Sequence, residues 1–231
     1  SGSDSIQSVA PLPSTVRDLS SAFSSISTNP TGLGSWDVSN VNDFQSMFAG
    51  ASAFNPPANG ESLASWGING FSSNTMMASM FRDATAFDDD LSSWDVSEVY
   101  DFRNMFEGAS AFTSDLSGWT VDRVNSPSLM RRMFDGATSF NSDLSGWCVS
   151  DLDRPDDFVA PNQLTNEPLW RAPCTGIPAA SSADMLLTFE TTTANESVRF
   201  YMQGANAFVI WEPGRYNYYT GNASPEWIFE T

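Results

Sequence analysis

Carboxylates and two cysteines are the side chains of this sequence that could do chemistry. The 231 residues include 28 Asp and Glu, ten Arg, no Lys and no His, and the formal net charge is −18. Without His, the chain lacks the commonest general base and the commonest metal ligand. No carboxylate pair accompanies a nucleophile signature, a glycine-rich phosphate loop or a metal-ligand spacing. We therefore expect no catalytic residue and no enzymatic activity.

Three consecutive carboxylates, Asp88, Asp89 and Asp90, could supply the oxygen ligands that Ca²⁺ takes. Asp90, however, occupies the same place in a sequence repeat as Asp115 and Asp143, directly before a leucine. That recurrence is typical of a turn residue. The sequence therefore favours structural turns, no metal ligand and no cofactor, with calcium at this cluster as the alternative.

The two cysteines, Cys148 and Cys174, lie close to the end of the repeats. A bridge between them would tie the segment after the repeats to the last repeat. Free thiols or a metal site are the alternatives, but two cysteines without His cannot complete a zinc tetrahedron. Asn195-Glu-Ser and Asn222-Ala-Ser are acceptor sequences for N-glycosylation. Together these features favour an oxidising, extracellular setting.

The pattern Leu-x-x-Trp-x-Val-x-x-Val occurs five times, and its leucines lie 25 to 30 residues apart. Such a period is typical of solenoids, whose units bury their apolar faces by stacking. A second pattern, Met-Phe followed by a Phe six residues after the first, travels with it. We expect these positions to form a core ladder, which comprises Trp36, Trp66, Trp94, Trp119, Trp147, Phe48, Phe81, Phe106 and Phe134.

Each repeat has the pattern of a short strand followed by a short helix. Trp94 and Val96 alternate with small polar residues, as in a half-buried strand. In residues 101–106 the apolar side chains have helical spacing, and Asp101 could cap that helix. The predicted fold class is α+β: a leucine-rich-repeat-type solenoid of about five coils, each with a short parallel strand and a short helix, followed by a small all-β module.

The predicted domain boundaries follow the periodicity. Residues 1–15 form an N-terminal extended arm and residues 16–152 the solenoid. Residues 153–182 form a disulfide-stapled cap and linker, and residues 183–231 a β-sandwich-like module that is short for a complete sandwich. The arm could therefore supply a missing strand to its own chain or to a neighbour, and its assembly-strand candidates are Ile6, Val9 and Leu12.

The whole repeat, from Asp90 to Val99 and then Met105 to Phe112, closely resembles the BspA-like leucine-rich repeat surface proteins. The resemblance covers residues 16–150. It implies a secreted or cell-surface protein that acts in adhesion and interaction. In that family the repeats are often followed by a β-sandwich that begins much like residues 186–200 here.

Two classes of function follow from these patterns. The first is a secreted or cell-surface protein that assembles head to tail with itself into a filament or surface layer, because a head-to-tail contact that does not close makes a filament. The alternative is a monomeric adhesin module that binds an extracellular protein or a glycan. The acidity argues against nucleic-acid partners. No apolar run approaches the roughly 20 residues of a membrane-spanning helix, so we expect no membrane insertion.

Overall fold

The protein is described from a computed structural model. The structure describes residues 9–56, 61–66, 70–149, 152–155, 157–160 and 163–170, and the backbone of four strands between residues 185 and 220. The chain divides into two units, Ser1–Trp170 and Arg171–Thr231. Each unit is described by itself.

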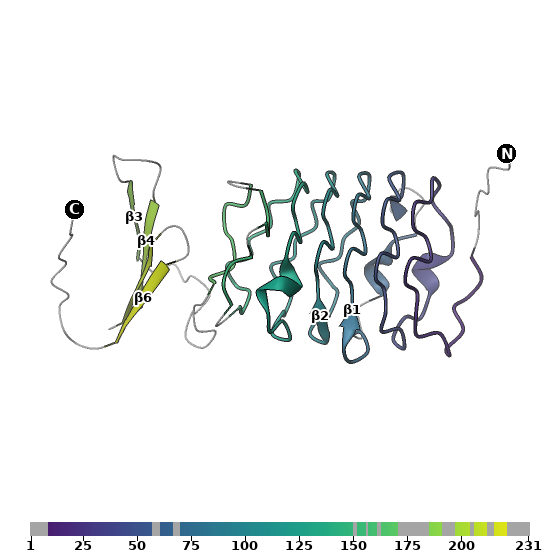
Figure 1. Cartoon of the computed structure of the whole chain (residues 1–231), viewed down its shortest axis with the longest axis horizontal. Coiled ribbons are helices and arrows are strands. Elements are labelled where there is room, and N and C mark those ends of the chain that lie inside the picture. Colours follow the sequence, from purple (N-terminus) through teal and green to yellow (C-terminus); the bar gives the residue numbers. More distant parts are fainter. Residues whose placement is uncertain are drawn as a thin grey trace. The chain divides into compact units, whose positions relative to one another are not determined.

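The first unit is a stack of flattened coils that lie side by side in sequence order (Figure 1). Its elements are short. The strands β1 (Thr75–Met76) and β2 (Val99–Asp101) form a parallel pair. Single parallel bridges join Asp18 to Asp43 and Asp43 to Met76, which continues the ladder toward the N-terminus. The 3₁₀ turns are η1 (Leu33–Ser35), η3 (Leu63–Ser65) and η4 (Pro127–Met130).

The predicted leucine-rich-repeat-type solenoid of about five strand-and-helix coils is wrong. The described residues contain no α-helix, and their parallel strands are limited to β1 and β2 in the first unit. The strand expected around Trp94 and Val96 is a pair of turns, closed by hydrogen bonds from Trp94 N–H to the Leu91 carbonyl and from Val99 N–H to the Val96 carbonyl.

Backbone geometry explains why residues 101–108 form turns instead of a helix. Asn104 and Gly108 have left-handed φ angles of 58° and 72°, which no right-handed helix contains. Alternate N–H groups leave the coil: those of Phe102 and Phe106 donate to carbonyls of the next coil at 2.9 Å. The intervening Met105 N–H donates to the carbonyl three residues before it. Backbone hydrogen bonds that a helix would keep are thus used to join neighbouring coils.

Aromatic side chains stack between the coils and make the core. One column, Phe23, Phe48, Phe81, Phe106 and Phe134, has ring centroids 5.5 to 5.6 Å apart. A second column, Phe54, Phe87, Phe112 and Phe140, lies 4.0 to 4.2 Å from the first. The tryptophans form a third column, in which each indole N–H after the first donates to the leucine carbonyl of the preceding coil at 2.8 to 3.0 Å.

A cap covers the C-terminal end of the stack. The ring of Phe158 lies edge-on against that of Phe134, with centroids 5.4 Å apart. The backbone carbonyl of Phe158 accepts the Phe134 N–H. Asn166 accepts the Leu144 N–H through its backbone carbonyl. An ion pair of 2.7 Å between Arg154 and Glu167 holds the cap together. The last aromatic layer is therefore shielded by the chain itself.

The second unit contains an antiparallel sheet in the order β3-β4-β5-β6. Its strands are β3 (Met185–Glu190), β4 (Ser197–Gln203), β5 (Asn206–Trp211) and β6 (Arg215–Thr220). All four strands lie within residues 183–231, the segment predicted as a small all-β module. Residues 221–231 lie outside the described residues.

Candidate interaction surfaces

The predicted core ladder lies inside the stack and offers no binding surface for most of its length. Phe48, Phe81, Phe106 and Phe134 are fully buried, and four of the five ladder tryptophans are 3 to 4% exposed. Trp36, the first of them, is partly exposed. Within the described stack, groups that could bind a partner therefore lie on the perimeter of the coils or at the ends of the stack.

Cys148 takes part in a disulfide bond, and no described cysteine is free. Its predicted partner, Cys174, lies outside the described residues, as do the predicted glycan acceptors Asn195 and Asn222. The pairing and the two glycosylation sites therefore stay predictions.

The described part of the N-terminal arm packs against the first coil of its own chain. Val9 and Leu12 pack against the core, and the Val9 N–H donates to the Thr31 carbonyl at 2.9 Å. The carbonyl of Ala10 accepts the indole N–H of Trp36 at 2.8 Å. Ile6, the third assembly candidate, lies outside the described residues.

The carboxylates of the acidic cluster point to separate partners. Asp88 accepts the N–H and hydroxyl of Thr113, whereas the buried Asp89 accepts the Ser62 hydroxyl and the Leu63 N–H. Hydrogen bonds from Ser92 lower the pKa of Asp90. Among the residues that the structure describes, no group of three His, Cys, Asp or Glu side chains could hold a metal ion. Asp90 therefore acts as a turn residue, whereas Asp88 and Asp89 join neighbouring coils.

The perimeter that carries Asp37, Asp95 and Thr120 is polar and built of small side chains. Its neighbouring column is formed by Ser35, Ser65, Ser93, Gly118 and Gly146, all exposed. A Cβ atom added to Gly118 or Gly146 would meet nothing within 4 Å. This smooth face offers few groups that could anchor a partner.

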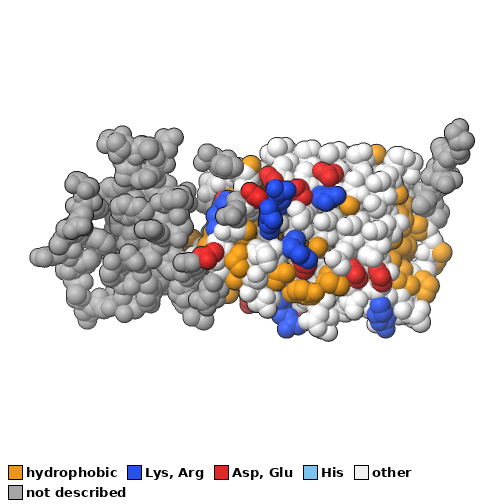
Figure 2. Space-filling model, in the orientation of Figure 1, with side chains coloured by type: hydrophobic (Ala, Val, Ile, Leu, Met, Phe, Trp, Pro, Cys, Tyr) orange, Lys and Arg blue, Asp and Glu red, His pale blue; other side chains and the backbone are white. Residues whose placement is uncertain are grey.

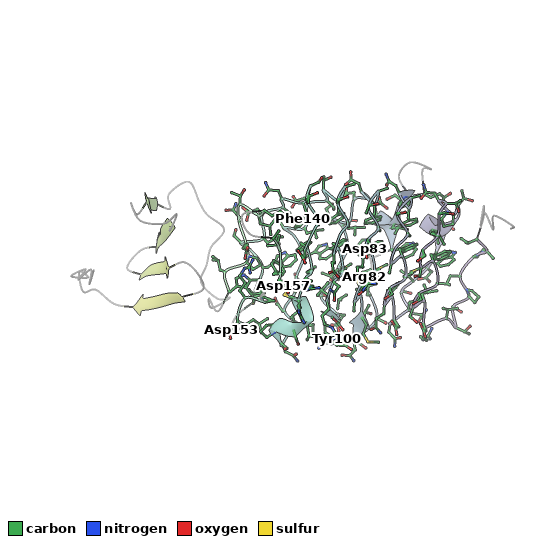
Figure 3. All side chains as sticks on the ribbon, turned by 45° about the horizontal axis from the view of Figure 1, so that its top comes forward. Arg82, Asp83, Tyr100, Phe140, Asp153 and Asp157 are labelled. Carbon is green, nitrogen blue, oxygen red and sulfur yellow. The ribbon has the colours of Figure 1, made fainter. Side chains whose placement is uncertain are left out.

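A different face combines an aromatic ring, apolar side chains and arginines. We call it the Arg–Tyr face. Tyr100 projects from β2, and η4 lies beside that strand, joined by the hydrogen bond from Phe102 N–H to the Leu129 carbonyl. Figure 2 shows charged side chains next to exposed apolar ones on this side of the stack, and Figure 3 labels Tyr100 near η4. Its residues are Met76, Tyr100, Arg103, Arg123, Leu129 and Arg131.

Ion pairs hold the arginines of this face in place. The nearly buried Asp101 binds Arg103 at 2.7 Å, and this hydrogen-bonded carboxylate raises the pKa of the guanidinium. Arg123 pairs with Glu98, and Arg131 with Asp157 at 3.5 Å. The three arginine side chains are nevertheless 45 to 60% exposed. They are oriented by their carboxylates and still reach solvent.

Sequence reasoning missed this face because it treated residues 101–106 as a helix. The signal was present in the repeat alignment, where one column reads Ser20, Gln45, Ala78, Arg103, Arg131. Two arginines at the end of a column of uncharged residues mark a local departure from the repeat. Once the strands are placed correctly, Tyr100 and Leu129 fall beside them.

The N-terminal end of the stack carries unpaired backbone acceptors. Hydrogen bonds in the first coil run from its N–H groups to the carbonyls of the second coil, for example from Phe23 to Met47 at 2.9 Å. Equivalent carbonyls of the first coil accept no hydrogen bond from the described residues; they belong to Asp18, Ser20, Ala22 and Ser24. Any segment that docks here must bring N–H donors.

Comparison with known proteins identifies the family of the chain. A model described as "Mycoplasma protein of unknown function, DUF285" matches residues 12–69 and again residues 58–170. The chain belongs to this family. The two matches cover the stack and its cap, which indicates that the family unit is a group of stacked coils. No curated protein and no solved structure matches the chain.

The family description supplies no activity, so the arguments for function rest on the surfaces above. Among the described residues, no helix has the length and apolarity needed to cross a bilayer.

Proposed function

We propose that this protein is a secreted or cell-surface interaction module that binds an extracellular protein through the Arg–Tyr face. The observation that carries the proposal is the composition of that face. Tyr100 is the one tyrosine of the described stack, and three of its exposed arginines lie on the same face. Tyr and Arg are the residues most enriched at the energetic centres of protein interfaces.

The geometry of the face supports protein binding in two ways. Met76, Tyr100 and Leu129 are partly exposed and give apolar area that a partner can bury. The arginines are held by Asp101, Glu98 and Asp157, so they lose less side-chain freedom when a partner binds. The rest of the described perimeter consists largely of small polar side chains.

An extracellular location is part of the proposal. The disulfide bond of Cys148 supports it, because such bonds persist in oxidising compartments. The resemblance to BspA-like leucine-rich repeat surface proteins supports the same location, as do the acceptor sequences at Asn195 and Asn222.

A binding experiment with a matched control tests the proposal. The purified chain is immobilised and exposed to surface proteins from the organism that produces it. The test variant is Tyr100→Ser with Arg103→Ala, which installs the residues of neighbouring coils at these positions. The control variant is Ser93→Ala with Thr120→Ala on the smooth face. We expect the test variant to lose a partner that the control retains. Equal retention by both folded variants would exclude the Arg–Tyr face.

A second candidate function is end-to-end self-assembly into a filament or surface layer. The unpaired carbonyls at Asp18, Ser20, Ala22 and Ser24 favour it, because a neighbouring molecule could complete the ladder there. The capped C-terminal end argues against simple stacking of coils, since Phe158 covers Phe134. A filament joint would therefore need donors from outside the stack.

Negative-stain electron microscopy of the full chain, with and without millimolar calcium, tests this candidate. Regular filaments that disappear when Ser20 and Ser24 are changed to Arg would support assembly through the N-terminal end. Isolated particles under both conditions would exclude autonomous assembly and leave partner binding as the function.

A further inference from the structure

Trp36 has an environment that the other ladder tryptophans lack. Its ring stacks on Trp66, with centroids 6.2 Å apart and planes within 6°, but no tryptophan precedes it. Its indole N–H therefore donates to Ala10 in the arm instead of to a leucine carbonyl. Trp66 and Trp94 are 4% and 3% exposed, whereas Trp36 is partly exposed. The first coil thus presents an aromatic surface that later coils bury.

A hollow of about 270 Å³ is lined by Trp36 and its neighbours. Gly34 at its edge packs closely on the next coil, since an added Cβ would lie 2.8 Å from the Ser62 carbonyl oxygen. The lining residues that matter for binding are Ser35, Trp36, Asp37, Ser39 and Ser65.

The polar groups around the hollow are mainly hydrogen-bond acceptors. One carboxylate oxygen of Asp37 accepts the Ser39 N–H at 3.0 Å, and hydrogen bonds from Ser39 lower the pKa of Asp37. Hydroxyls of Ser35 and Ser65 donate to the carbonyls of Gly32 and Gly34, both at 2.8 Å, so their oxygens are free to accept.

We propose that this hollow is a binding site for a neutral carbohydrate. A sugar ring presents C–H groups that pack on an aromatic surface and several hydroxyl donors around its edge. Trp36 supplies the aromatic surface, and Asp37 with the two serine oxygens supplies acceptors. An acidic sugar does not fit, because the Asp37 carboxylate and the net charge of −18 repel it.

The third coil provides a built-in control. Residues 91–96 repeat the Leu-x-Ser-Trp-Asp-Val sequence of residues 33–38, and Asp95 binds the Ser97 N–H as Asp37 binds that of Ser39. Trp94, however, is buried against Trp119. The same sequence motif therefore has the carboxylate in both coils but the accessible ring only in the first. The site shares no residue with the Arg–Tyr face and does not depend on the function proposed for it.

Isothermal titration calorimetry of the full chain tests the proposal. The probes are laminarihexaose, cellohexaose and mannohexaose, with a chondroitin sulfate hexasaccharide as the acidic comparison. We expect at least one neutral probe to bind at millimolar concentration and the acidic probe to give no heat. Asp37→Ala should weaken that binding by about tenfold, the loss of one hydrogen bond to a charged group. Asp95→Ala should leave it unchanged.

Fluorescence provides a second readout for the stacking role of the ring. A bound neutral hexasaccharide should protect the wild-type protein against acrylamide quenching, and Trp36→Phe should abolish that protection. The proposal is overturned if no neutral probe binds, if the acidic probe binds better, or if the Asp37 and Asp95 variants lose affinity equally.

Discussion

The first and third coils carry nearly the same sequence but have different surroundings. Trp36 and Trp94 occupy equivalent positions, and both are followed by an Asp that binds the N–H two residues later. Trp94 is 3% exposed because coils lie on both sides, whereas Trp36 is partly exposed at the end of the column. In a stack of repeats, the place of a unit therefore decides what its residues can do.

The two ends of the stack differ as well. Most backbone hydrogen bonds between coils in the turn segments run from an N–H to a carbonyl of the following coil, as from Ser46 to Ala78. The turn segments therefore leave acceptors at the N-terminal end and donors at the C-terminal end. At the C-terminal end the described residues include a cap, in which the Phe158 carbonyl accepts the Phe134 N–H. Because most of these hydrogen bonds point in the same direction along the stack, the two ends expose different backbone groups.

The largest expected difference between middle and end concerns the phenylalanine column. Phe106 stacks on Phe81 and Phe134, both at 5.6 Å, whereas Phe23 stacks on Phe48 alone in that column. Phe106→Ala should lower the free energy of unfolding by about 3–5 kcal/mol. Phe23→Ala should cost about half as much, because one side of its ring has no aromatic neighbour in the column. Urea denaturation followed by circular dichroism measures both, and equal losses would contradict the comparison.

Substitution of Asp89 measures how much a buried polar contact stabilises a middle coil. Its buried carboxylate accepts the Ser62 hydroxyl and the Leu63 N–H. Asp89→Ala should cost about 1–3 kcal/mol, since a buried N–H then lacks a partner. Asp89→Ser should cost less, because Ser114 and Ser142 accept the corresponding leucine N–H groups in the next coils. Thermal unfolding of the two variants separates them, and identical melting temperatures would show that the Leu63 hydrogen bond contributes nothing.

The repeat could be predicted from the sequence, but its backbone could not. Identical Trp and Phe residues that recur every 25 to 30 residues predict stacking, and the ladder positions follow from that recurrence. Residues 102–106 were misread because Phe102, Met105 and Phe106 have helical spacing. The same spacing also suits turns closed by i to i−3 hydrogen bonds, with a left-handed residue at Asn104. Asn tolerates that conformation well, so local sequence alone did not separate the two.

The candidate surfaces were harder to predict for a different reason. The exposure of Trp36 depends on the absence of a preceding tryptophan and on the path of the arm, which are properties of the whole stack. Arg103 and Tyr100 come together only when β2 is placed at Val99–Asp101. Sequence periodicity identifies what repeats, whereas these surfaces depend on where the repetition stops or varies.

Glycines provide a smaller test of the turn geometry. Gly108 has φ +72°, and an added Cβ would lie 2.5 Å from an Asp83 carboxylate oxygen. Gly108→Ala should therefore cost about 1–2 kcal/mol. Gly118→Ala, on the smooth face where nothing lies within 4 Å, should change stability by less than about 0.5 kcal/mol. Guanidinium denaturation compares the two, and a neutral Gly108→Ala would show that the left-handed turn is not required there.

The smallest expected effect is the dependence of stability on pH, and it should be independent of position in the stack. Hydrogen bonds from a serine two residues later lower the pKa of Asp37 in the first coil and of Asp90 in a middle coil below the usual range of an Asp carboxyl. A lowered pKa stabilises the fold above the pKa of the unfolded chain, about 3.9, and this contribution is lost as the pH falls through the folded-state value. The urea midpoint should therefore start to fall only below about pH 4.

Asp37→Asn and Asp90→Asn should each reduce that acid-dependent change by a similar small amount, because the largest contributions to both pKa shifts come from hydrogen bonds within one turn. Urea midpoints measured at successive pH values give the comparison, with Asp122→Asn as a control whose carboxylate binds no described serine. A much larger change for Asp90 would mean that the pKa of a turn carboxylate depends on its neighbours in the stack. In that case turn hydrogen bonds, like the aromatic contacts, would contribute differently at the end and in the middle of the stack.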